Sequence, residues 1–228
     1  MSKLNTIIEC LSSMKSIKNI EGMRRFGINS DMAFGIRIPV LRALAKKHRN
    51  DHELALQLWQ TGYHEARILA SMVDNPKLVT TSQMDDWVQN FNSWDLCDQV
   101  CSNLFVKTPF AIEKIEEYSQ TTPEFIKRTA FSMIAALTVK CKNVEDKVFI
   151  ELLQTCEREA WDQRNYVKKA VNWAVRQIGK KNINLWEHAI AASERILMQG
   201  TAPARWIAND ALRELKRKHL DIKKKSHN

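Results

Sequence analysis

The stretch QRNYVKKAVNWAVRQIGK, residues 163–180, decides the class of fold. Four apolar residues recur in it at helical spacing and form one narrow stripe: Val167, Val171, Ala174 and Ile178. Such a stripe is typical of an α-helix that packs on one side only. Almost every segment after Pro39 shows the same period, and no alternating pattern of a β-strand competes with it. We therefore predict an all-α chain.

Few residues interrupt this helical pattern. The 228 residues include only 6 glycines and 5 prolines, which argues against collagen-like, low-complexity and turn-rich all-β architectures. Twelve helices are expected, at about residues 3–17, 39–48, 52–61, 63–73, 82–91, 94–107, 109–120, 123–138, 144–158, 163–180, 183–198 and 203–218. Short loops between helices of this length favour antiparallel pairs in a bundle or a solenoid.

A weak internal repeat favours the solenoid. Four segments place a basic residue just ahead of a small and apolar stripe: ARILASM around Arg67, KRTAFSM around Arg128, KKAVNWA around Lys169 and ARWIAND around Arg205. Their spacings of 61, 41 and 36 residues fit helix-pair repeats of the HEAT or armadillo size class. We predict an α-α superhelix of HEAT-like or armadillo-like repeats that forms a curved solenoid. Residues 1–218 would make one repeat domain, and residues 219–228 a basic C-terminal tail.

The charge of the chain points to a polyanionic partner. Lys and Arg number 35 against 26 Asp and Glu, which gives a formal charge of +9. The N-terminus lacks a secretory pattern, and no run of 18 apolar residues exists. Five cysteines without a disulfide spacing favour reduced thiols in the cytoplasm. Cys97 and Cys101 could share a metal on one helix face, but two buried thiols are the commoner outcome, and we expect no metal.

The helix 163–180 has a chemically unusual outer face. Opposite the apolar stripe, Tyr166 and Trp173 lie among Lys169, Arg176 and Lys180. Lys168 and Lys181 add to this charge, and the whole window from residue 163 to 186 contains no acidic residue. A cationic face with interleaved aromatic residues is typical of nucleic-acid binding. The alternative is a solvated face whose tryptophan packs on a neighbouring helix.

The helix 94–107 is unusual in the opposite sense, because a carboxylate interrupts an apolar row. Trp94, Asp98, Cys101 and Phe105 share one face. Ser93 is a suitable N-cap and the helix dipole explains Asp95, but neither effect explains Asp98.

A carboxylate beside a tryptophan marks either a functional site or a structural salt bridge to a neighbouring helix. Arg128, which should project away from its own apolar stripe, could pair with Asp98 or contact a phosphate. Two further sets have a structural interpretation. Glu65 and Arg67 would be members of surface ion pairs, and Trp59, Trp161, Trp186 and Trp206 would pack between helices.

Five segments together resemble a known family: FGIRIPVLRALAK (34–46), LWQTGYHEARILA (58–70), WVQNFNSWDLCDQ (87–99), FIKRTAF (125–131) and KKAVNWAVRQIGK (168–180). They are similar to the AlkD-type DNA alkylation repair family of HEAT-like repeat DNA glycosylases, over roughly residues 20 to 215. The resemblance implies that Trp94 and Trp173 are paired tryptophans at the lesion nucleotide. It also implies that Asp98 is the catalytic carboxylate and Arg128 the adjacent arginine.

The implied chemistry accounts for both unusual helices. A purine alkylated at N3 or N7 carries positive charge and leaves without a general acid, so the sugar becomes cationic. The ionised form of Asp98 and the faces of Trp94 and Trp173 would stabilise that charge. We therefore expect a monomeric DNA glycosylase that excises such purines from duplex DNA in base excision repair, without a metal or an organic cofactor. The alternatives are a non-catalytic HEAT-like protein that binds distorted or branched DNA, and a peptide-binding helical scaffold.

Overall fold

The computed structural model describes residues 2–225, with side chains up to His219, and all regular secondary structure in this part of the chain is helical, without a β-strand. The helices form two compact units, Met1–Phe110 and Ala111–Asn228. The prediction of an all-α chain is confirmed. The single domain over residues 1–218 stays a prediction.

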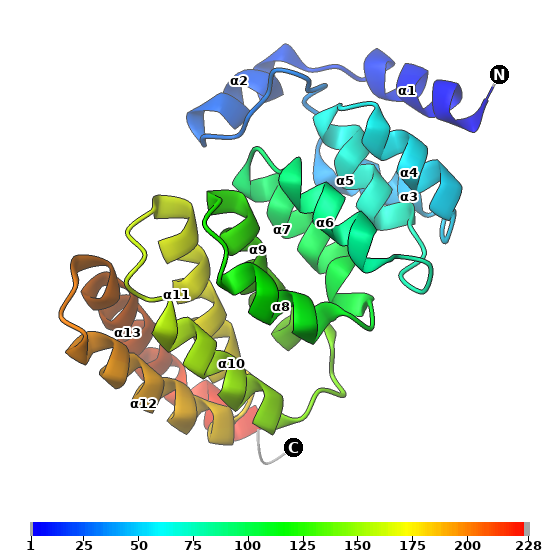
Figure 1. Cartoon of the computed structure of the whole chain (residues 1–228). Helices are drawn as coiled ribbons and strands as arrows, with labels where there is room; N and C mark the ends of the chain where they lie inside the picture. The colour runs from blue at the N-terminus through cyan, green and yellow to red at the C-terminus, as the bar shows by residue number, and fades with distance from the viewer. Residues whose placement is uncertain (1, 226–228) are drawn as a thin grey trace. The chain divides into compact units, whose positions relative to one another are not determined.

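The N-terminal unit contains seven α-helices and one 3-10 turn within its described residues (Figure 1). They are α1 (Lys3–Ser13), α2 (Ile17–Arg25), α3 (Ile38–Ala45), α4 (His52–Gln60), α5 (His64–Val73), α6 (Thr81–Gln89), α7 (Trp94–Asn103) and η1 (Phe105–Lys107). Helix α5 packs against α3, α4 and α7 and is the centre of this unit. Trp59 of α4 stacks face to face on Trp87 of α6, with ring centroids 3.9 Å apart, so the interpretation of Trp59 as a packing residue is confirmed.

Two predicted helices of this unit have different bounds in the structure. The expected helix 3–17 ends at Ser13, and a second helix, α2, follows with Ser16 as its N-cap. The Ser16 hydroxyl accepts a hydrogen bond from the backbone N–H of Asn19, which starts the new helix. The expected helix 94–107 ends at Asn103, because Leu104 leaves the helical region with φ of −127°, and a 3-10 turn follows.

The C-terminal unit contains the six remaining helices of the described residues (Figure 1). They are α8 (Ala111–Ser119), α9 (Glu124–Lys140), α10 (Asp146–Arg158), α11 (Asn165–Gly179), α12 (Ile183–Met198) and α13 (Ala202–Lys225). Helix α11 packs against α9 on one side and α13 on the other, while α10 packs against α12. The predicted basic tail, residues 219–228, begins inside α13, and its side chains beyond His219 lie outside the described residues.

The apolar stripe that predicted α11 lies in the core of this unit. All four of its residues are fully buried. Gly179, the last residue of α11, is buried as well, and a Cβ atom there would lie 2.7 Å from the Leu215 side chain and 2.8 Å from the Ala189 Cβ. This glycine is therefore needed for the close packing of α11 against α12 and α13 rather than for a turn.

Among the described residues, no helix is both long and apolar enough to cross a membrane. Cys97 and Cys101 are buried, and no group of three or more His, Cys, Asp or Glu side chains among these residues could hold a metal ion.

Candidate functional site

Glu65 organises the loop that follows α2. Its side chain is only 1% exposed, and its carboxylate accepts three backbone hydrogen bonds, from the N–H groups of Phe34 (2.8 Å), Gly35 (2.6 Å) and Ile36 (3.1 Å). Gly35 has φ of +76°, and a Cβ atom at this position would collide with the carbonyl oxygen of Ser16. The prediction that Glu65 forms a surface ion pair is wrong, because the backbone of the loop supplies its partners.

Arg67 does not pair with Glu65 either. Its guanidinium lies over the ring of Trp59, 5.2 Å from the centroid, and donates to the carbonyl oxygens of Trp59 and Asn90, both at 3.4 Å. Burial lowers the pKa of Arg67, and the negative charge of Asp86 opposes this shift. Arg67 therefore joins α5 to its neighbours as a structural residue.

The first turn of α7 is fixed by an ion pair. The Nε2 atom of buried His64 lies 2.9 Å from an Asp95 carboxylate oxygen, and the Ser93 hydroxyl donates to the other oxygen at 2.8 Å. Burial acts to raise the pKa of Asp95, but the hydrogen bond and charge of His64 outweigh it and hold that pKa below its ordinary value. Ser93 precedes the helix as predicted, yet its hydroxyl makes no capping bond to the backbone. Asp95 thus does more than complement the helix dipole, since it ties α7 to α5.

Trp94 and Asp98 lie on this fixed turn of α7. The Trp94 indole N–H donates to the carbonyl oxygen of Phe26 at 3.0 Å, which connects the tryptophan to the end of α2. Asp98 is half-buried one helical turn further along the same row, and it has interactions of its own. The remaining row members, Cys101 and Phe105, are fully buried. The predicted pair of an aromatic ring and a carboxylate is therefore held at the boundary between core and surface.

A small cavity adjoins this turn. It has a volume of about 190 Å³ and is lined by residues of α2, of the loop around Gly35, and of the starts of α3, α5 and α7. Glu65, His64 and Asp95 all contribute to its wall, and all three already have hydrogen-bond partners. The cavity therefore lies among positioning residues, beside the row that carries Trp94 and Asp98.

In the C-terminal unit, Arg128 is not the surface residue that its sequence pattern predicts. It is 5% exposed, and its guanidinium donates to the carbonyl oxygen of Tyr166 at 2.6 Å. The Tyr166 ring stacks on Phe125, with centroids 5.5 Å apart. Helix α9 packs between neighbours on more than one side, so even residues off its apolar stripe are buried.

The window without acidic residues gains its counter-charges from α13. Glu214 pairs with Arg176 and, at 2.8 Å, with Lys180, and Asp210 lies 3.8 Å from Arg176. Burial acts to raise the pKa of Glu214, but hydrogen bonds from Lys180 and Arg176 outweigh it and leave the pKa lowered. Two of the six residues predicted to bind DNA are thus neutralised within the unit.

The other predicted residues of α11 have different surroundings. Lys168 lies over the ring of Trp206 at 4.9 Å, and Lys181 lies over the ring of Phe149 at the same distance. Lys169 is exposed, and Trp173 is partly exposed on the side away from the core stripe. The role of Lys168, Lys169 and Lys181 in DNA binding stays a prediction.

The structure separates the predicted site residues into two sets. Trp94 and Asp98 belong to the N-terminal unit, whereas Arg128, Trp173 and the cationic residues with Tyr166 belong to the C-terminal unit. Sequence reasoning missed the positioning roles of Glu65 and His64. The adjacent His64 and Glu65 at the start of a helix were the available signal, but their partners lie about 30 residues away.

The class of protein follows from the helical units and from their comparison with known proteins. The chain has the HEAT-like repeat fold: a solved structure described as a new family of proteins related to the HEAT-like repeat DNA glycosylases, with affinity for branched DNA structures, matches it with a TM-score of 0.75. The two are 18% identical, and the match covers 85% of this chain and 83% of the other. A profile described as DNA alkylation repair enzyme matches residues 7–215. The chain belongs to this DNA alkylation repair family. A search of curated proteins returned no match.

Proposed function

We propose that the protein is a monofunctional DNA glycosylase that excises N3- and N7-alkylated purines from duplex DNA. The observation that carries the proposal is the Trp94 and Asp98 pair on the first two turns of α7, in a chain of the DNA alkylation repair family. This pair offers an electron-rich ring and a carboxylate on one helix face, which suits a reaction that develops positive charge on a sugar.

The charge of Asp98 can supply a large part of the rate acceleration. At about 4 Å and an effective dielectric of about 20, a carboxylate stabilises a unit positive charge by roughly 4 kcal/mol. If this energy is gained only in the transition state, it corresponds to a rate increase on the order of 10³. The alkylated base already carries positive charge and departs as a neutral purine, so the reaction needs neither a metal nor a general acid.

The surrounding residues support this role by fixing the position of the pair. The Phe26 carbonyl holds the indole of Trp94, and the ion pair between His64 and Asp95 holds the turn from which Trp94 and Asp98 project. Such preorganisation favours catalysis, because the charged group need not reorient as the transition state forms. Trp173 and Arg128 of the C-terminal unit are part of the proposal as further contacts to the DNA, and we propose that the protein acts as a monomer in the cytoplasm.

Base release from methylated DNA tests the proposal. Duplex DNA that contains N7-methylguanine or N3-methyladenine is incubated with the wild type and with Asp98→Asn, which keeps the shape of the side chain and removes its charge. We expect release by the wild type and a drop in rate on the order of 10³ in the variant. No release by the wild type would refute the proposal.

A second candidate function is non-catalytic binding of branched DNA. The structural match to a protein described as having affinity for branched DNA favours it. This alternative predicts DNA binding with a steep dependence on salt, no base release, and unchanged or tighter binding by Asp98→Asn, because the substitution removes a negative charge. The same set of proteins therefore separates the two functions.

A further inference from the structure

An exposed tryptophan stands at the start of α13. Trp206 is 41% exposed, and its neighbours Ala204, Ile207 and Ala208 fill the core in its place. The interpretation of Trp206 as a packing residue is therefore wrong. The same interpretation is wrong for Trp161, whose side chain is exposed, at 56%. It is confirmed for Trp186, whose indole N–H donates to the Leu215 carbonyl oxygen at 3.0 Å.

The seam between α11 and α13 explains why Trp206 is unusual. Along this seam Arg176 meets Glu214, 38 residues further along the chain, and Lys180 meets the same carboxylate. Lys168 lies eight residues, about two helical turns, before Arg176 on α11, and it lies over the ring of Trp206, which is again 38 residues further along the chain. Lys168 of α11 therefore contacts an aromatic ring of α13, whereas Arg176 and Lys180 contact a carboxylate of the same helix.

The carboxylates of the described residues do not compensate the positive charges around Trp206. Arg205 is exposed and donates to the Gly200 carbonyl, and Lys169 is exposed on α11. In the described part of the chain no carboxylate pairs with Lys168, Lys169 or Arg205. The nearest carboxylate along α13, Asp210, already pairs with Arg213 and approaches Arg176.

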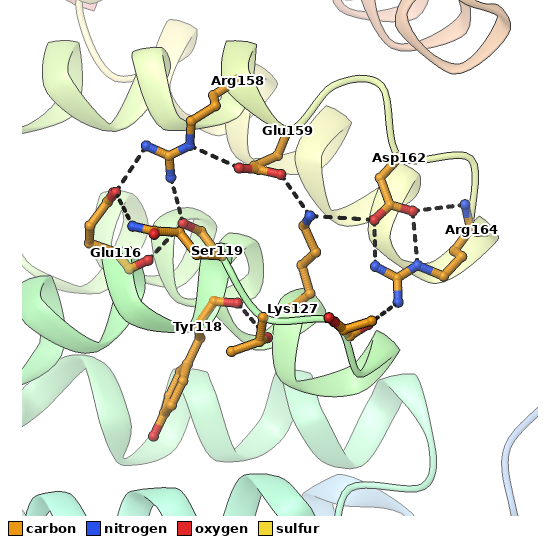
Figure 2. A network of polar contacts seen from close by, with 11 residues as sticks. Glu116, Tyr118, Ser119, Lys127, Arg158, Glu159, Asp162 and Arg164 are labelled. Atoms are coloured by element: carbon orange, nitrogen blue, oxygen red, sulfur yellow. Dashed lines mark hydrogen bonds and ion pairs between the residues drawn. The ribbon is translucent and has the colours of Figure 1, made fainter.

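Trp161, the second exposed tryptophan, also has a cation over its ring, but the charge of that cation is compensated by carboxylates. Lys127 lies over the ring of Trp161 at 4.8 Å, but its ammonium group pairs with Glu159 at 2.6 Å and faces Asp162 at 3.6 Å. Figure 2 shows this network, in which Arg158 also bridges Glu159 to α8. Trp161 therefore has the same aromatic ring and a similar exposure, but the described cation over its ring is already paired with carboxylates.

We propose that Trp206, with Lys168 and Arg205, forms a platform that binds an unpaired nucleotide of DNA at a fork or a single-stranded arm. The base stacks on the exposed part of the indole, and the two cations meet the flanking phosphates. Base stacking on an aromatic side chain requires an unpaired base, because both faces of a paired base are covered in a duplex. This inference rests on the proposed function, since it names the form of DNA that the protein engages in addition to the lesion site.

Binding of two matched DNA ligands tests the platform. A blunt duplex and a fork with the same duplex and two short single-stranded arms are titrated, as fluorescence anisotropy ligands, with the wild type, Trp206→Ala, Trp206→Phe and Trp161→Ala. We expect Trp206→Ala to weaken fork binding by roughly 5- to 100-fold and to leave duplex binding unchanged. Trp206→Phe retains most of the affinity, and Trp161→Ala behaves as the wild type. Lys168→Ala lowers the salt slope of fork binding by roughly 0.7.

Each contrary outcome is distinct. If Trp206→Ala weakens fork and duplex equally, or weakens neither, the platform is refuted while the proposed glycosylase is untouched. If Trp161→Ala weakens fork binding as much as Trp206→Ala, the uncompensated charge is irrelevant and the argument fails. If the wild type binds neither ligand and releases no base, both the platform and the proposed function are refuted.

Discussion

Replacement of Glu65 by glutamine should destabilise the N-terminal unit strongly. The carboxylate accepts hydrogen bonds of 2.8, 2.6 and 3.1 Å from three consecutive backbone N–H groups. A glutamine has one carbonyl oxygen for two of them, and its NH₂ group faces the third donor. One bond to a charged acceptor, about 1.5–3 kcal/mol, is lost, and two others weaken by about 0.5–1.5 kcal/mol each. Relief from burying a charge offsets part of this loss, so we expect a net cost of about 2–4 kcal/mol.

Urea denaturation of Glu65→Gln and of a matched control measures this cost. Glu53→Gln is the control, because Glu53 is an exposed glutamate on α4 whose bond is to Gln57. We expect the control to change the free energy of unfolding by less than about 0.5 kcal/mol. The loop held by Glu65 also leads back to Phe26, which holds Trp94, so the base-release rate of Glu65→Gln should fall as well. A loss of stability no larger than that of the control would show that the three bonds do not fix the loop.

Three further predictions follow from the packing and the charges. Gly179→Ala should cost about 1–3 kcal/mol in thermal or chemical denaturation, because the new Cβ meets α12 and α13, whereas Gly22→Ala, with open space around it, should be neutral or stabilising by about 0.5–1 kcal/mol. Glu214→Gln should tighten duplex binding and steepen its salt dependence in anisotropy titrations, because it frees two cations of α11. The lowered pKa of Asp95 means that its ionised form stabilises the fold above the unfolded pKa of about 3.9, and that this contribution is lost as pH falls through the lower folded pKa. The melting temperature should therefore decrease below about pH 4, and less steeply in Asp95→Asn.

The parts of the fold that depend on local pattern were predictable from the sequence. Helix α11 has one apolar stripe and one polar side, so its periodicity was clear, and its four stripe residues are fully buried. The sequence does not indicate helix α2, because the helix is short and its segment, with Gly22 and few apolar residues, lacks a strong period. Arg128 was misplaced because helical spacing identifies one apolar face and cannot show that α9 is packed on several sides.

The parts that depend on distant partners were not predictable. Glu65 binds main-chain N–H groups, which every residue except proline has, so no residue type marks its partner. The window without acids around Trp173 suggested a freely cationic face, yet Glu214 neutralises part of it from 34 and 38 residues away. The sequence predicts that Trp206 packs between helices, because periodicity alone does not show which side of α13 meets α11.

The role of Asp98 is tested most directly by the single-turnover rate of base release from one N7-methylguanine duplex at saturating protein. Under this condition neither DNA binding nor product release limits the observed rate, so the rate constant measures the chemical step. We predict that Asp98→Asn lowers this rate constant on the order of 10³ relative to the wild type and binds the duplex at least as tightly. Equal rate constants for the two proteins, with both released bases identified as N7-methylguanine, would contradict the assignment of Asp98 as the catalytic carboxylate.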